Sequence, residues 1–145
     1  MILSAHEIVR RIGREPVEGK LIIRPYLHEC QQPASYDLRA ALDISLVRGR
    51  CTLVPTLEWV ELPTDIAGTL RCRSSFGRKG VLLGAGYIDP GFRGQLTLCL
   101  TNTGEADLPV HQNDRIVQMI LHEVRGGSGG YSGKYQDSIG AVEAR

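Results

Sequence analysis

This chain of 145 residues lacks several features that would place it in a class by composition alone. Its 17 basic and 16 acidic residues leave a net charge of +1, so no strong charge points to nucleic acid or a membrane surface. Aromatic residues make up only 6%, too few for a platform that stacks single-stranded bases. No apolar run approaches the roughly 20 residues of a membrane span, and no signal-peptide pattern opens the chain. We therefore expect a soluble, cytoplasmic protein without a nucleic-acid or membrane partner.

Paired metal-binding residues are also missing. The four cysteines are far apart, without a Cys-x-x-Cys pair, and the four histidines are not spaced as metal ligands. The segment His28-Glu29-Cys30 is close to a zinc-deaminase signature, but such enzymes need His-x-Glu and a later Pro-Cys-x-x-Cys. We therefore exclude zinc-dependent deamination and interpret the cysteines as small buried side chains.

The residue pattern that is present predicts an all-β protein with one short N-terminal helix. Ser4 and Glu7 can form a capping box at the start of that helix, and Gly13 would end it. After it, alternating apolar and polar residues predict strands. These lie near residues 21–23, 42–46, 57–61, 68–72, 96–101, 108–110 and 116–124. Turn residues recur about every 8 to 12 positions, a spacing typical of a β-sandwich or barrel.

A Gly-rich segment separates the end of the sequence from the rest. Residues 126–130 read Gly-Gly-Ser-Gly-Gly, a composition typical of a flexible linker. We therefore expect a β domain at 1–125, followed at 126–145 by a hinge and a mobile tail. Such a tail is either disordered or able to close over a site, and both interpretations stay open at this point.

The first candidate site segment follows a predicted strand and is rich in hydrogen-bond donors. Arg73, Ser74 and Ser75 offer a guanidinium, two hydroxyls and backbone N–H groups, all of which suit phosphate oxygens. Alone, this segment would be read as an ordinary turn. Arg78 adds a second cation and favours phosphate binding.

The second candidate segment, 86–94, places a carboxylate in a stiff turn. Asp89 stands directly before Pro-Gly, where it could simply initiate the turn, or could orient and deprotonate a water that attacks phosphorus. Gly84 and Gly86 would let the backbone approach a ligand closely. The main chain could then read a planar base, and Phe92 would pack against a deoxyribose and leave no room for a 2′-hydroxyl.

Two further positions each have two interpretations. Asp37 could form a surface ion pair with Arg39 or could help to order the water shell of a magnesium ion. Gln118 lies among apolar residues, so its amide needs a partner, which could be structural or a phosphate.

Together these segments resemble the dUTPase and dCTP deaminase superfamily over nearly the whole chain. The matching segments, in the family's order, are 35–39, 73–78, 86–94, 114–118 and 133–136. The resemblance implies a jelly-roll-like β fold, a homotrimer with active sites between subunits, and a Mg²⁺-bound nucleoside triphosphate as substrate.

The resemblance also implies a role for individual residues. Asp89 would be catalytic. The phosphate-binding set would be Arg73, Ser74, Ser75, Arg78, Gln118, Lys134, Tyr135 and Gln136. The nucleoside-binding set would be Gly84, Ala85, Gly86, Tyr87, Ile88 and Phe92. Magnesium would be held chiefly through phosphates and waters, with Asp37 as the candidate protein group.

One position separates the activities within the superfamily. In dCTP deaminases the strand after the Asp-Pro-Gly turn carries a glutamate that moves protons at the cytosine ring, and here Cys99 stands at that place. A thiol is a poor substitute for a carboxylate that must accept and donate protons. The chain is thus most similar to the archaeal type of dUTPase, which has deaminase-like motifs without the glutamate. We expect hydrolysis of dUTP to dUMP and pyrophosphate; the alternatives are a dCTP deaminase, perhaps bifunctional, and a dUTP-binding protein without turnover.

Overall fold

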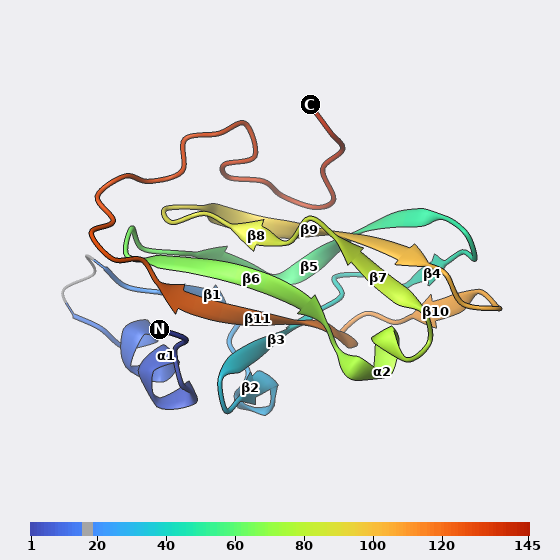
Figure 1. Cartoon of the computed structure of the whole chain (residues 1–145), viewed down its shortest axis with the longest axis horizontal. Coiled ribbons are helices and arrows are strands. Elements are labelled where there is room, and N and C mark those ends of the chain that lie inside the picture. The colour runs from blue at the N-terminus through green and yellow to red at the C-terminus, as the bar shows by residue number, and fades with distance from the viewer. Residues whose placement is uncertain (16–18) are drawn as a thin grey trace.

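The computed structural model describes residues 1–15 and 19–145, which fold into packed antiparallel sheets (Figure 1). The helical elements are α1 (Ala5–Ile12), the 3-10 helix η1 (His28–Cys30) and α2 (Ser74–Gly77). The strands are β1 (Ile22–Arg24), β2 (Gln31–Gln32), β3 (Ser35–Arg39), β4 (Ile44–Leu46), β5 (Cys51–Glu61), β6 (Ile66–Cys72), β7 (Val81–Gly84), β8 (Tyr87–Ile88), β9 (Arg93–Asn102), β10 (Leu108–Val110) and β11 (Arg115–Glu123).

Within the described residues, the strands pair in the orders β1-β5-β9-β7, β2-β3-β11-β6-β8 and β10-β4, and every pairing is antiparallel. The expected all-β, jelly-roll-like fold is confirmed. So is the N-terminal helix, because the Ser4 hydroxyl accepts a 3.3 Å hydrogen bond from the backbone N–H of Glu7 and Gly13 ends the helix. No helix in the described part of the chain is long and apolar enough to cross a membrane.

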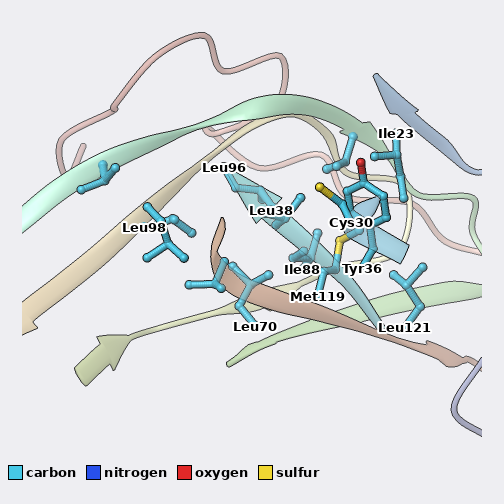
Figure 2. Close-up of a cluster of buried hydrophobic side chains, with 14 of the residues drawn as sticks. Ile23, Cys30, Tyr36, Leu38, Leu70, Ile88, Leu96, Leu98, Met119 and Leu121 are labelled. Atoms are coloured by element: carbon cyan, nitrogen blue, oxygen red, sulfur yellow. The ribbon is translucent and has the colours of Figure 1, made fainter. Parts of the chain in front are cut away.

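The hydrophobic core lies between the two larger sheets, as Figure 2 shows. Leu96, Leu98 and Leu100 of β9 are buried, while the residues between them are only partly buried. The alternation read from the sequence therefore points one face of β9 into the core and leaves the other for a site.

A buried ion pair joins the two larger sheets. The side chain of Glu58 in β5 is fully buried, and Arg39 in β3 is 6% exposed. One carboxylate oxygen accepts a 2.6 Å bond from the Arg39 Nε, and the other accepts a 2.9 Å bond from its backbone N–H. A second Arg39 nitrogen donates to the carbonyl of Pro25 at 3.3 Å. This network fixes β3 against β5.

Replacing Glu58 by glutamine is expected to lower the free energy of unfolding by about 3 to 5 kcal/mol, because the buried Arg39 guanidinium loses its counter-charge. Urea denaturation measures the effect. Glu105→Gln, at an exposed position, is the matched control and should change stability by less than about 0.5 kcal/mol. Equal midpoints for the two variants would contradict this account of the pair.

The C-terminal segment, expected from the sequence to be a hinge and mobile tail, lies along the outside of β9 in this structure (Figure 1). The backbone N–H of Gln95 donates to the carbonyl of Ser138 at 2.8 Å, and Gly94 and Ser138 form a parallel bridge. The strand β7 pairs with β9 only from Cys99 to Asn102, so the tail covers the part of the β9 edge that β7 leaves open.

Candidate active site

One cavity of about 550 Å³ gathers most of the residues expected to act on a nucleoside. Its walls come from the 85–92 segment, from the outer face of β9 and from the C-terminal segment. The expected catalytic residue, Asp89, is among the lining residues.

The turn that carries Asp89 is fixed to the end of β5. The backbone N–H of Phe92 donates to the Asp89 carbonyl at 3.2 Å, which closes the turn. Leu62, directly after β5, makes two backbone hydrogen bonds to the turn. Its N–H donates to the carbonyl of Phe92 at 2.9 Å, and its carbonyl accepts from the N–H of Gly91 at 3.0 Å. The turn therefore holds Asp89 at the cavity on a rigid support.

The expected nucleoside-binding set is brought together with one exception. Ala85, Gly86, Tyr87, Ile88 and Phe92 all line the cavity. The exception is Gly84, which pairs with Cys99 and is not in the lining.

Glycine at position 86 has a structural reason in addition to the close approach to a ligand expected from the sequence. Its φ is +104°, and an added Cβ would lie 3.3 Å from side-chain atoms of Leu70 and Leu83. Close packing inside the protein, together with the backbone conformation, requires glycine there.

The outer face of β9 supplies a polar row that sequence reasoning identified only in part. Gln95, Thr97 and Cys99 alternate along the strand and all line the cavity. Cys99 thus faces the same cavity as Asp89, as its strand parity indicated. Burial raises the pKa of its thiol above the ordinary value, so the group stays protonated and neutral near pH 7.

Arg73, which lies between β6 and α2, joins Arg115 in a separate cluster around a buried carboxylate. Asp37 is 2% exposed and lies between two cations: its Oδ2 is 3.1 Å from the Arg73 Nε and 3.6 Å from an Arg115 guanidinium nitrogen. Burial raises its pKa, while the two arginines oppose that shift. Oδ2 has no hydrogen-bond partner of suitable geometry among the described residues. Asp37 therefore supplies a negative charge beside Arg73 and Arg115, whereas Arg39 is paired with Glu58.

The other expected phosphate-binding residues of this region lie on α2, at its end and on β11. Ser74 and Ser75 begin α2 directly after Arg73, both exposed, and Arg78 caps the end of α2. Gln118 on β11 is half-buried and accepts a 3.4 Å bond from the Ser35 hydroxyl, so its oxygen has a structural partner and its NH₂ group is the part suited to phosphate.

Within one chain the Arg73 cluster lies far from Asp89, although Leu70 of β6 lines the cavity only three residues before Arg73. Ile88, next to Asp89, pairs with Gly68 of β6, and Arg73 follows five residues later, directly after the end of that strand. At about 3.3 Å per residue this corresponds to roughly 17 Å. Figure 1 shows α2 beyond the far end of β6. None of the described residues that line the cavity belongs to 73–78.

The tail places two aromatic residues at the cavity, only one of which was expected there. Tyr135 is in the lining, as is Tyr131, whose ring meets Phe92 edge-on with centroids 5.7 Å apart. Lys134 lies over the Tyr135 ring, its nitrogen 5.6 Å from the centroid. Neither Lys134 nor Gln136 lines the cavity.

Several lining residues were missed from the sequence. They are Leu53, Leu70, Gln95, Leu96, Thr97, Tyr131, Ser138, Val142 and Ala144. The strand parity of Cys99 could have identified Gln95 and Thr97. No sequence signal places Val142 or Ala144 beside Asp89.

The described residues can also be examined for side chains that could bind a magnesium ion. No group of three or more His, Cys, Asp or Glu side chains in residues 1–15 and 19–145 is arranged to hold a metal ion. Mg²⁺ commonly keeps several waters and binds largely through substrate phosphates, so a dedicated set of protein ligands is not required for it.

Comparison with known proteins identifies the family of the chain. A family model described as dCTP deaminase-like matches residues 41–124. A dCTP deaminase of Thermococcus sibiricus is 34% identical, over 95% of this chain and 93% of that protein. A dUMP-forming dCTP deaminase of Aquifex aeolicus is 31% identical, over all of this chain and 94% of that protein.

Solved structures show the same fold. A dUTPase of EIAV superposes with a TM-score of 0.63 at 21% identity, covering 80% of this chain and 98% of that one. A dCTP deaminase of Agrobacterium tumefaciens gives 0.67 at 21% identity, covering 83% and 47%. The chain is therefore a member of the dCTP deaminase-like family.

Proposed function

We propose that this enzyme hydrolyses dUTP to dUMP and pyrophosphate. The observation that carries the proposal is the pair of side chains at one cavity: Asp89 is present, and Cys99 occupies the strand position at which the resembling deaminases carry a glutamate. The carboxylate that could activate water for attack on a phosphate is therefore present, while the glutamate that would transfer protons at a cytosine ring is missing.

In the proposed reaction Asp89 accepts a proton from a water as its oxygen attacks the α-phosphorus. A bond forms between that oxygen and phosphorus, and the bond to the oxygen that bridges the α- and β-phosphates breaks. The electron pair leaves with pyrophosphate. Magnesium, bound mainly through phosphate oxygens and water, would neutralise part of the charge.

Charge on the phosphates would also be balanced by Arg73, the hydroxyls of Ser74 and Ser75 and the amide of Gln118. Because these groups lie far from Asp89 in one chain, we propose that each site combines the cavity of one subunit with the 73–78 segment of another, in a homotrimer. Arg78 would reach the phosphates from that neighbouring subunit, and Lys134 would approach them from the tail.

Selection of the nucleoside would rest on the cavity walls. Phe92 is held by Tyr131 and presents a rigid apolar surface, which suits a deoxyribose without a 2′-hydroxyl. The backbone of 85–88 offers N–H and C=O groups to the uracil edge. The neutral thiol of Cys99 would face the C4 side of the base without protonating it.

Hydrolysis of dUTP in ¹⁸O-labelled water tests the proposal. The expected products are dUMP that carries one ¹⁸O atom and unlabelled pyrophosphate, because water attacks the α-phosphorus. Label in pyrophosphate would place the attack on the β-phosphorus, and an absence of turnover would overturn the proposed function.

The second candidate function is deamination of dCTP, which is the activity named for the similar proteins of Thermococcus sibiricus and Aquifex aeolicus. It requires a general acid and base at the cytosine ring, and loss of such a group typically costs about 10² to 10⁴ in rate. Ammonia release from dCTP distinguishes this candidate from the first.

A further inference from the structure

Specific hydrogen bonds join the C-terminal segment to the Asp89 turn and to β9. The Tyr131 N–H donates to the carbonyl of Pro90 at 2.7 Å, and the Asp137 N–H donates to the carbonyl of Arg93 at 2.9 Å. Further on, the Val142 N–H donates to the Thr97 hydroxyl at 2.9 Å. The tail thus runs from the turn along the outer face of β9, where it forms one wall of the cavity.

Two glycines of the turn make this close approach possible. At Gly91, φ is +78° and an added Cβ would lie 2.7 Å from the backbone of Gly130. At Gly94, φ is +147° and an added Cβ would lie 2.9 Å from the Ser138 nitrogen. Both contacts are shorter than real Cβ atoms make, so the turn accommodates the tail backbone only because glycine stands at these two positions.

The side chain of Gln136 spans the junction between turn and tail. Its oxygen accepts from the Arg93 N–H at 2.9 Å, while its nitrogen donates to the carbonyls of Gly91 at 2.9 Å and Tyr131 at 3.2 Å. Both donors of the amide are used in these bonds. In this structure the Gln136 amide bonds turn and tail together, and the phosphate-binding role that the resemblance implies for it stays a prediction.

A charged pair lies beside this amide. The Arg93 guanidinium makes two parallel hydrogen bonds to the Asp137 carboxylate, through Nε and through Nη2, the latter at 2.9 Å. Such bidentate pairs add geometric specificity as well as attraction. Asp137 has a φ of +60°, a conformation that aspartate and asparagine tolerate better than most residues.

We propose that Arg93, Gln136 and Asp137 are positioning residues that clamp the tail onto the Asp89 turn, so that Tyr131 and Tyr135 form a wall of the nucleotide site. None of the three lines the cavity, so they act through the tail they hold. The kinetic part of this inference rests on the proposed function, whereas the clamp itself does not.

Limited digestion with trypsin tests the clamp without reference to activity. Cleavage after Lys134 requires the tail to leave β9, and its rate follows the population of the open form when opening and closing are fast. We expect Gln136→Ala to accelerate this cleavage about tenfold, since it removes three hydrogen bonds. Asp137→Asn and Arg93→Gln should each accelerate it several-fold. The double variant Arg93→Gln/Asp137→Asn should be cleaved no faster than either of its single variants, because both substitutions remove the same interaction.

Glu143→Gln is the matched control, because it removes one negative charge from an exposed position of the same tail. It should leave cleavage after Lys134 at the wild-type rate. Rates equal to wild type in the three clamp variants, or additive effects in the double variant, would overturn the clamp.

Kinetics with dUTP then test the positioning role. The clamp variants should show a KM several-fold higher and a kcat within about twofold of wild type, because the binding-competent form is less populated. Faster cleavage with an unchanged KM would overturn the positioning role. Should the wild-type chain leave dUTP intact, the proposed function fails, and the clamp is decided by the cleavage rates alone.

Discussion

The Asp89→Asn variant should release pyrophosphate from dUTP about 10² to 10⁴ times more slowly than the wild-type chain. Asparagine keeps the shape of the side chain but cannot accept a proton from water. The turn should stay intact, because it is held by backbone bonds of Asp89, Gly91 and Phe92 rather than by the carboxylate. Pyrophosphate release measures the rate, and calorimetry with dUTP should show that binding is retained.

Asp107→Asn is the matched control for this substitution. Asp107 is exposed, and its Oδ1 accepts a hydrogen bond from the Arg48 N–H that asparagine can also accept. The Asp107→Asn variant should release pyrophosphate from dUTP at the rate of the wild-type chain. Turnover by Asp89→Asn within a few-fold of wild type would remove Asp89 from the mechanism.

Truncation after Gly126 should lower kcat/KM for dUTP by about 10² or more. The deletion removes Tyr131, Tyr135 and the rest of the wall that the tail provides, and small losses of positioning cost such factors. The β domain should remain folded, because the buried core between the sheets lies upstream of the cut. Circular dichroism and thermal unfolding provide the control for folding.

The truncation also decides between the two interpretations of the tail left open by the sequence. If the tail closes the site, kinetics change far more than the unfolding temperature does. Unchanged kinetics would show that the tail has no part in the reaction, although it lies against the turn in this structure.

Much of the fold could be predicted because its signals are local. The cap of α1 depends on residues three apart, and the alternation along β9 is visible in the strand itself. The same alternation correctly indicated that Cys99 faces away from the leucine core. The Asp-Pro-Gly turn likewise carries its own conformational signal.

What the sequence could not show depends on contacts between distant segments. Glu58 lies in a strand whose pattern gave no sign that a carboxylate is buried, and its partner Arg39 is nineteen positions away. One of the two interpretations of Asp37 from the sequence is an ion pair with Arg39, whereas the structure places Asp37 between Arg73 and Arg115. Gln136 likewise finds its partners on the turn.

The most direct test of the central claim is a parallel incubation of the purified protein with dUTP and with dCTP, each with Mg²⁺, in which both pyrophosphate and ammonia are measured. We predict pyrophosphate and dUMP from dUTP, and no ammonia from dCTP. Ammonia release from dCTP at a rate comparable to the turnover of dUTP would contradict the account, because it would require proton transfer at the base in a site where Cys99 replaces the glutamate.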